Sequence, residues 1–446
     1  MIELQFVSGQ HSAVFFHAPF RHLDRSTAWL RMTLLGASFL GMVASAPLWI
    51  NSHAFPLLPI APWFPILPAP WDKGLFALML LALVAALWCY RPAVGFFLIA
   101  GLFSFFEDQN RGQPWFYMYW VMLILSLFPE PSPELQATFA KRFAGVRANP
   151  ALAACRCAIS VAYIWSGIQK FNSRFFTVTP AWFIAPAARW HLPAGLIEML
   201  RWSVMCAPVL EVGIGLALWV PRLRLAAIFS VAALHLMALL FLGPLGYNYN
   251  WVVWPWNLAM VTLVWSLFGA DKFWRKRQTS VVSEKTAKAK HSKPRLFLEQ
   301  TFAELKHSKF AMLVLGLFSF LPILSYRGWW DSYFSFSLYS ENAAVANVFI
   351  SKEFGDRLPP NMRPYVQQFP QAFDPQHQGP YVFGFQAWGY EELHVPPISE
   401  PRNFRSVFHF LRSYSREPND LRMIVGQRWG PVIFYEGERY EFLMPK

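Results

Sequence analysis

The residues best suited to chemistry are a lysine, a glutamate and a histidine in three successive apolar stretches. Lys170 closes the apolar part of the stretch 151–176, Glu211 lies in the next stretch, and His235 lies in the one after that. An ammonium held in hydrocarbon costs about 2.5–3.5 kcal/mol on membrane-insertion scales. Lys170 therefore has three alternatives: its side chain reaches the interface, finds a partner, or loses its proton.

Each alternative gives these side chains a different role. A lysine paired with Glu211 stays an ammonium and ties two helices together, whereas an apolar surrounding favours a neutral amine. A neutral amine acts as a general base or as a nucleophile towards carbonyls. His235 would then donate to a developing negative charge or carry a proton. Ser166 and Gly167, one turn before Lys170, favour the close approach of another helix.

The surrounding sequence is typical of a helical membrane protein with many spans. Its 446 residues are 55% hydrophobic and 18% aromatic, but only 15% are charged, and long uncharged runs recur along the chain. We predict an all-α polytopic bundle of about nine transmembrane helices, eight of them within 28–268. The predicted spans are 28–50, 75–91, 93–106, 115–128, 151–171, 204–220, 223–242, 247–268 and 309–327.

The net charge of +13 comes largely from one connection between predicted spans, a basic loop at 269–308. Basic loops mark the cytoplasmic side of a membrane, so we expect this loop and the N-terminal residues 1–27 to be cytoplasmic. Nucleic-acid binding is not expected, because no known binding module accompanies the basic run. The sequence predicts an integral protein of a bacterial inner membrane or a plasma membrane.

This topology places the three ionisable residues at similar depth. Lys170 falls near the outer end of its span, and a rise of 1.5 Å per residue puts Glu211 and His235 each roughly 10 Å below the outer surface. Ionisable residues inside spans are functional candidates. We therefore predict Lys170, His235 and Glu211 as candidate catalytic residues. The scattered histidines show no metal-ligand spacing, so no metal is expected.

Further candidates lie on the expected outer side. The turn 106–114 is dense in polar residues, which indicates either a solvated turn or a polar lid on a pocket. The proline-rich loop 51–74 cannot form a long helix and is expected along the interface. The candidate substrate-binding residues in and near the outer connections are Asp108, Asn110, Trp115, Tyr117, Trp329 and Trp330.

Residues 328–446 differ in composition from the rest and predict a small mixed or β-rich extracytoplasmic domain. Short alternating runs such as 381–385, 423–426 and 432–435 are typical of strands bounded by Gly and Pro. The segment 404–414 has the pattern of an amphipathic helix.

The chain resembles the vitamin K-dependent gamma-carboxylase family and its bacterial relatives, grouped as the horizontally transferred transmembrane (HTTM) domain. The resemblance covers roughly 150–350. It rests on Tyr163-x-x-Ser166-Gly167-Ile168-Gln169-Lys170-Phe171-Asn172, on Leu210-Glu211 with Gly215, on Arg222 and Arg224, on His235, and on 328–350, which contains Leu338-Tyr339-Ser340.

The resemblance implies a role for Lys170 as the base that activates reduced vitamin K or another isoprenoid quinol, with His235 at a histidine position of the family. It implies a lipid quinone and a peptide or protein on the outer face as partners, besides the bilayer. One feature departs from the family, which has a further functional histidine in an outer turn. The corresponding turn here, 108–117, has none.

Two other functions fit the same residues. A non-catalytic membrane scaffold would use Lys170 and Glu211 as a tie between helices and its outer domain to bind a partner. A transporter would carry only a lipid-like cargo, because few polar residues line the predicted spans.

Overall fold

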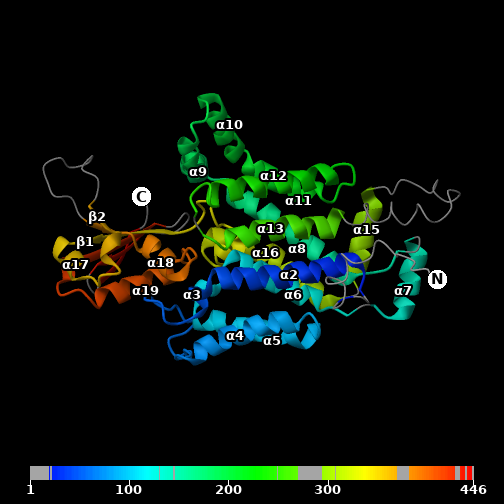
Figure 1. Ribbon diagram of the computed structural model, residues 1–446, viewed down its shortest axis with the longest axis horizontal. Coiled ribbons are helices and arrows are strands. Elements are labelled where there is room, and N and C mark those ends of the chain that lie inside the picture. Colours follow the sequence, from blue (N-terminus) through cyan, green and yellow to red (C-terminus); the bar gives the residue numbers. More distant parts are fainter. Residues whose placement is uncertain are drawn as a thin grey trace, which may run out of the picture.

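The computed structural model shows an elongated helical bundle with a smaller α/β unit at one end (Figure 1). It describes residues 20, 23–129, 131–143, 146–248, 250–269, 294–306, 308–368, 381–426, 432–436 and 439–443. Most of the expected N-terminal segment 1–27 and of the basic loop 269–308 lies outside these residues.

The helices of the bundle follow one another along the chain. They are α2 (Arg25–Ala44), α3 (Ala46–Trp49), α4 (Trp71–Ala85), α5 (Tyr90–Glu107), α6 (Pro114–Ser126), α7 (Pro133–Arg142), α8 (Pro150–Gln169), α9 (Ser173–Ile184), α10 (Ala194–Met205), α11 (Ala207–Ala217), α12 (Arg224–Leu242), α13 (Val253–Val264), α15 (Pro294–Leu305) and α16 (Lys309–Phe320). Short helical turns add η1 (Gln109–Arg111), η2 (Ala185–Trp190), η3 (Trp265–Gly269) and η4 (Leu321–Arg327).

Four helices among the described residues are long and apolar enough to cross a membrane: α2, α8, α12, and α16 continued by η4. A fifth results if α10 and α11, which meet at a bend of 53°, form one broken span. The expectation of about nine spans is therefore not supported. A span needs about 20 residues, whereas α4 has 15 and α6 has 13.

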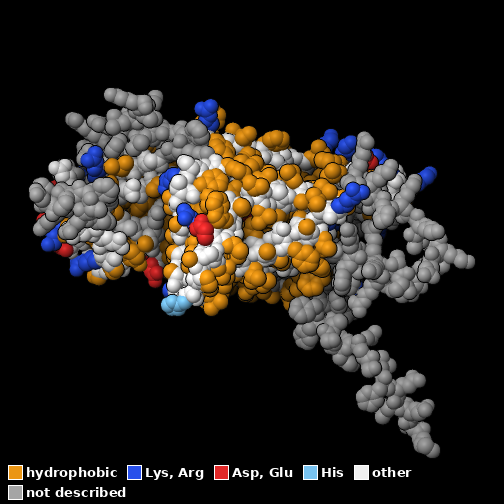
Figure 2. All heavy atoms as spheres, turned by 90° about the horizontal axis from the view of Figure 1, so that it is seen from above, with side chains coloured by type: hydrophobic (Ala, Val, Ile, Leu, Met, Phe, Trp, Pro, Cys, Tyr) orange, Lys and Arg blue, Asp and Glu red, His pale blue; other side chains and the backbone are white. Residues whose placement is uncertain are grey.

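The surface of the bundle is consistent with a membrane environment. Figure 2 shows hydrophobic side chains gathered over the middle of the bundle and charged side chains towards its two ends. Leu236 on α12 is 69% exposed and Leu258 on α13 is 64% exposed. Exposed apolar surface of this extent is costly in water and natural in lipid.

Helix α8 is the central element of the bundle. It begins at a cap in which the Asn149 side chain accepts from the Leu152 N–H, with Pro150 at the first helical position. It packs closely against α11 at Gly215. A Cβ on Gly215 would lie 2.8 Å from the Ser160 carbonyl oxygen of α8. The expected close approach of another helix to the small residues of α8 is confirmed.

The C-terminal unit contains a six-stranded antiparallel sheet in the order β2-β3-β1-β4-β5-β6. Its elements are β1 (Val345–Ile350), α17 (Lys352–Arg357), β2 (Val366–Gln368), β3 (Tyr381–Phe383), α18 (Phe385–Leu393), α19 (Pro401–Arg412), β4 (Leu421–Gly426), β5 (Val432–Glu436) and β6 (Arg439–Leu443). The predicted strands and the amphipathic helix near 404–414 are confirmed.

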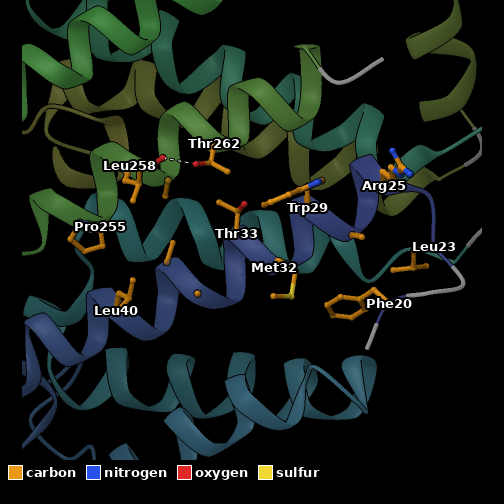
Figure 3. Close-up of a pocket in the computed structure, with 14 residues that line it drawn as sticks. Phe20, Leu23, Arg25, Trp29, Met32, Thr33, Leu40, Pro255, Leu258 and Thr262 are labelled. Atoms are coloured by element: carbon orange, nitrogen blue, oxygen red, sulfur yellow. Dashed lines mark hydrogen bonds between the residues drawn. The ribbon is translucent and has the colours of Figure 1, made fainter. Parts of the chain in front are cut away.

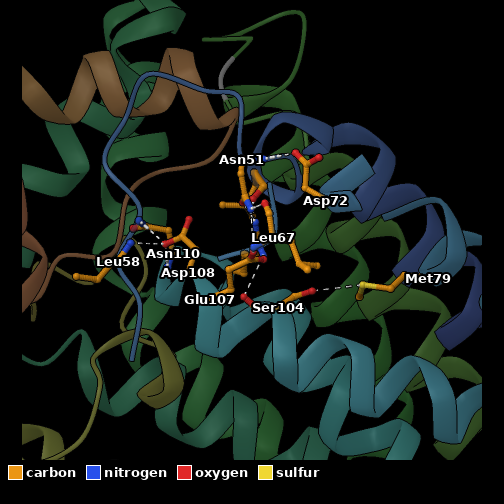
Figure 4. Close-up of polar contacts among 11 residues, drawn as sticks. Asn51, Leu58, Leu67, Asp72, Met79, Ser104, Glu107, Asp108 and Asn110 are labelled. Atoms are coloured by element: carbon orange, nitrogen blue, oxygen red, sulfur yellow. Dashed lines mark hydrogen bonds and ion pairs between the residues drawn. The ribbon is translucent and has the colours of Figure 1, made fainter. Parts of the chain in front are cut away.

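A buried ion pair holds the turn after α5. Arg111 Nη1 lies 2.5 Å from Glu107 Oε2, and both side chains are 1% exposed. The other oxygen of Glu107 accepts from the Leu67 N–H at 2.6 Å and from Asn51 Nδ2 at 2.8 Å, which fixes the proline-rich loop (Figure 4). The turn 106–114 is therefore not solvated, because the loop 51–74 covers it.

Candidate functional site

Lys170 lies at the C-cap of α8 and is held by three oxygen atoms. Its Nζ is 2.8 Å from Glu211 Oε2 on α11, 2.8 Å from Ser166 Oγ and 3.0 Å from the Ser166 carbonyl oxygen. Lys170 is 8% exposed and Glu211 is 7% exposed. The side chain does not snorkel to water, so of the three alternatives the structure contains the paired one.

The same geometry accommodates a proton on either partner. The carbonyl oxygen of Ser166 only accepts, whereas the Ser166 hydroxyl both donates and accepts. An ammonium on Lys170 would donate to all three oxygens. A neutral amine would donate its two N–H groups to the carbonyl and hydroxyl oxygens of Ser166 and accept from a protonated Glu211. The contacts therefore support transfer of a proton between Lys170 and Glu211 without rearrangement.

His235 is held at both ring nitrogens. Its Nδ1 is 2.5 Å from Asn257 Oδ1 and its Nε2 is 2.7 Å from the hydroxyl of Tyr163. The Asn257 Nδ2 donates to the Val253 carbonyl oxygen, which leaves Oδ1 to accept from Nδ1. In the neutral ring, Nε2 then accepts from the Tyr163 O–H. Tyr163 thus connects α8, which carries Lys170, to the imidazole.

Lys170, Glu211 and His235 line one cavity of about 200 Å³. Its walls are mostly apolar and come from α6, α8, α9, α11, α12, α13 and the segment before β1. The three residues that were expected at similar depth therefore line one cavity. The aromatic and sulfur-containing residues of the wall are Trp115, Phe175, Phe183, Met237, Trp256, Phe336 and Tyr339.

Three polar atoms of residues in this wall are buried without a hydrogen-bond partner in the structure. They are Trp115 Nε1, Thr179 Oγ1 and Asn250 Oδ1. A buried polar group without a partner costs about 1–3 kcal/mol, and native structures contain few of them. Two of these atoms are able to donate and two to accept.

Some of the predicted binding residues lie elsewhere. Of the six, Trp115 lines the cavity. Tyr117 instead packs on Phe334, with ring centroids 4.6 Å apart. Trp330 also packs on Phe334, at 5.8 Å, while Trp329 is 75% exposed.

Asp108 and Asn110 are buried in the joint between the bundle and the C-terminal unit, and neither lines the cavity. Asp108 Oδ1 accepts from the Leu58 N–H at 3.2 Å and from Asn110 Nδ2 at 3.0 Å (Figure 4). Asn110 Oδ1 accepts from the Ile398 N–H at 3.1 Å. These contacts bind backbone segments to one another, so the pair holds the joint together.

We compared the chain with profiles of protein families, with curated proteins and with solved structures. None of the three comparisons finds a match. The resemblance to the gamma-carboxylase and HTTM proteins therefore remains a prediction from the sequence.

The sequence interpretation did not assign several residues of the site. Tyr163 and Ser166 were noted only as part of a motif, and Asn257 not at all. Asn257 interrupts an apolar run as Glu211 and His235 do, and that signal would have found it. Thr179 and Asn250 give no such signal, because they lie at the edges of polar connections.

A larger hollow of about 520 Å³ lies between α2 and α13. Figure 3 shows Trp29, Thr33 and Leu40 of α2 on one side and Leu258 and Thr262 of α13 on the other. Among the described residues that line it, Arg25 alone is ionisable, so these residues offer no acid–base pair. No group of three or more metal-ligating side chains occurs among the described residues.

Proposed function

We propose that this chain is an integral membrane enzyme that binds a lipid-soluble quinol in the Lys170 cavity and performs acid–base chemistry on it. The N-terminus would lie in the cytoplasm and the C-terminal unit outside, as the Lys/Arg bias predicts. This function is similar to that of the gamma-carboxylase and HTTM proteins, for which reduced vitamin K is the quinol.

The observation that carries the proposal is the combination of groups around one apolar cavity. A buried Lys–Glu pair and an oriented imidazole line a largely apolar cavity, and three residues of its wall carry polar atoms without a partner. Apolar pockets with a few convergent polar groups are typical ligand sites. A volume of about 200 Å³ is below the ~300–1,000 Å³ typical of ligand pockets, so the cavity would hold a ring and leave an isoprenoid tail in lipid.

The residues that line the cavity fit a reduced quinone. Trp115 Nε1 would donate to one oxygen of the ring, and Asn250 Oδ1 would accept from a hydroxyl. When bound, a reduced quinone supplies an acidic hydroxyl and two reducing equivalents. Lys170 Nζ, after passing its proton to Glu211 Oε2, has a lone pair with which to take a proton as general base. His235 already donates to Asn257 and accepts from Tyr163, so it would hold the cavity wall in place beside Lys170 rather than donate to the ligand.

A second pocket adjoins this cavity and suits a partner from the outer face. It has about 360 Å³ and shares Thr179, Leu338 and Tyr339 with the cavity. Its rim carries the ion pair between Arg174 and Glu341, at 3.1 Å. A peptide or protein bound to the C-terminal unit would thereby lie beside the chemistry, and carboxylation of such a partner is the reaction implied by the resemblance.

The test is binding of a reduced naphthoquinone by the purified protein in lipid nanodiscs, and its oxidation there with dissolved oxygen as the two-electron oxidant, after subtraction of the rate without protein. Lys170→Ala is expected to abolish the protein-dependent oxidation. Trp115→Phe is expected to weaken binding of the naphthoquinone about tenfold, because it removes one neutral hydrogen bond of about 1.4 kcal/mol. Lys73→Ala, at an exposed lysine of α4, is the matched control. Oxidation by Lys170→Ala at the unsubstituted rate would exclude Lys170 as the base.

A non-catalytic scaffold is the second candidate, and one observation favours it. Lys170 Nζ has three oxygen acceptors, two on Ser166 of α8 and one on Glu211 of α11, as a structural tie between the two helices would. In that case Lys170→Ala lowers folded yield, and the double reversal Lys170→Glu with Glu211→Lys restores it. If the double reversal restores yield but not quinol oxidation, the enzyme proposal holds.

A further inference from the structure

Helices α9 and α10, joined by η2, form a hairpin that stands out from the side of the bundle. Figure 1 shows it near the end that carries the C-terminal unit. Helix α10 meets α11 at a bend of 53°, so α10 runs across the direction of the span that follows it. The hairpin is thus attached to the bundle without continuing through it.

The level of the hairpin is fixed by contacts with the ends of spans. Helix α9 begins at Ser173, just after α8 ends at Gln169. At the other end, Arg189 Nη2 donates to the Gly246 carbonyl oxygen and Trp190 Nε1 donates to the Leu245 carbonyl oxygen. The two acceptors lie three and four residues after Leu242, the last residue of α12. The hairpin therefore lies where two membrane-length helices end, which is the level of a membrane surface.

Helix α10 has three distinct faces. Ile197, Leu200 and Val204 pack on the small core around Phe241. A second flank carries exposed apolar side chains at a spacing of three residues, where they share one side of a helix. These side chains are Leu196, Met199 and Trp202, with exposed fractions of 36%, 60% and 55%.

The remaining flank of α10 is charged. Glu198 and Arg201 are paired at 3.9 Å, with side chains about half exposed. A helix with a buried seam, an exposed apolar flank and a charged flank suits an interface between hydrocarbon and water. Val209 and Leu210 of α11 are also exposed apolar residues, at 66% and 39%, and tryptophan is typical of the headgroup level.

We propose that the α9–α10 hairpin is an interfacial membrane element that lies on phospholipid. Leu196, Met199 and Trp202 enter the acyl boundary, while Glu198 and Arg201 face the headgroups and water. The inference rests on the membrane placement proposed above. Since Phe175, Thr179 and Phe183 of α9 line the cavity, lipid contact would bring the cavity wall to the bilayer surface, where a lipid-borne ligand arrives.

The test compares two adjacent residues with opposite expected surroundings. Nitroxide labels are placed by Met199→Cys and Glu198→Cys in a Cys89→Ser, Cys206→Ser background, which removes the two exposed natural thiols. In phosphatidylcholine nanodiscs, the Met199 label should collide preferentially with oxygen and the Glu198 label with a water-soluble nickel chelate. The ratio of the two collision rates should differ severalfold between these neighbours.

Two control labels separate the inference from the membrane placement. A label at Leu236→Cys reports the apolar surface of α12, and one at Lys352→Cys reports the C-terminal unit. Suppose that the Leu236 label is lipid-exposed, but that the Met199 and Glu198 labels share one environment, either water or lipid. The interfacial hairpin is then wrong and the membrane placement stands. If the Leu236 label is as water-exposed as the Lys352 label, both ideas fail.

Discussion

Gly167 of α8 lies directly against Pro208 of α11. A Cβ on Gly167 would come within 2.6 Å of the Pro208 carbonyl oxygen and 2.7 Å of Val212 Cγ2. This close approach occurs one turn before Lys170 and one turn before Glu211 on the facing helix. The absence of a side chain at position 167 therefore sets the separation of the helices that carry the buried ion pair.

Gly167→Ala is expected to separate α8 from α11 and to destabilise the fold by about 1–3 kcal/mol, the usual cost of overpacking. Thermal unfolding in detergent measures the change. Gly213→Ala on α11 is the control, because a Cβ there meets nothing within 4 Å. It should be neutral or slightly stabilising, since alanine favours helix. Equal effects of the two substitutions would contradict the close packing.

Glu107→Gln is expected to cost about 3–5 kcal/mol, because it leaves the Arg111 guanidinium buried without its counter-charge. The same substitution at Glu198, whose pair with Arg201 is exposed on α10, should cost about 0–1 kcal/mol. Unfolding of the two variants in the same detergent compares them. A loss at position 107 no larger than at position 198 would mean that the buried pair does not hold the outer turn.

Asn257→Leu removes the acceptor of the His235 Nδ1–H inside the cavity wall. Leaving that donor unpaired is expected to cost about 1–3 kcal/mol. Tyr163→Phe removes a single hydrogen bond to Nε2 and should cost about 0.5–1.5 kcal/mol. Nitrogen NMR of labelled histidine should also show the Nδ1–H tautomer lost in Asn257→Leu alone. Retention of that tautomer in Asn257→Leu would show that Asn257 does not orient the ring.

The stability of the C-terminal unit should depend on Asp420 at acid pH. Burial alone would raise the pKa of Asp420, but hydrogen bonds from the Glu417 and Arg416 N–H groups and from Arg357 and Ser351 lower it to about 2. The pKa of Asp420 is thus lower in the folded state than in the unfolded state, where it is about 4. The ionised carboxylate therefore stabilises the fold at pH values above about 4, and this contribution is lost as the pH falls towards 2.

Near-ultraviolet circular dichroism during urea unfolding, at pH values between about 4 and 2, measures this dependence. Asp420→Asn should be less stable than the unsubstituted chain at neutral pH, and the difference should shrink as the solution is acidified. A difference that stays constant across this range would show that the hydrogen bonds to Asp420 do not depend on its charge.

The sequence predicts local elements well where their signal is local. Helix α19 buries Phe404, Val407, Phe408 and Leu411, and this spacing is visible without the fold. Charge inside an apolar run is equally local, so Lys170, Glu211 and His235 could be selected as candidates, whereas the cavity that they share could not be predicted. The number of spans could not be predicted in this way, because hydropathy does not show that the helical run 194–217 bends at Cys206.

Long-range contacts explain what the sequence could not show. The turn 106–114 is polar, which suggests contact with water, yet Leu58 and Ile398 bring their N–H groups to Asp108 and Asn110 from distant segments. Tyr163 reaches His235 across 72 positions of the chain. Such contacts depend on which helices are neighbours, and neither composition nor spacing contains that information.

Lys170 and Glu211 cancel each other's charge inside the cavity. A void with zero net charge exerts no long-range pull on ions in the surrounding water, so electrostatic steering would not fill it. Occupancy would then follow how strongly a molecule partitions into the bilayer. Titrations of this protein should accordingly scale with the mole fraction of ligand per phospholipid and hardly change with added salt.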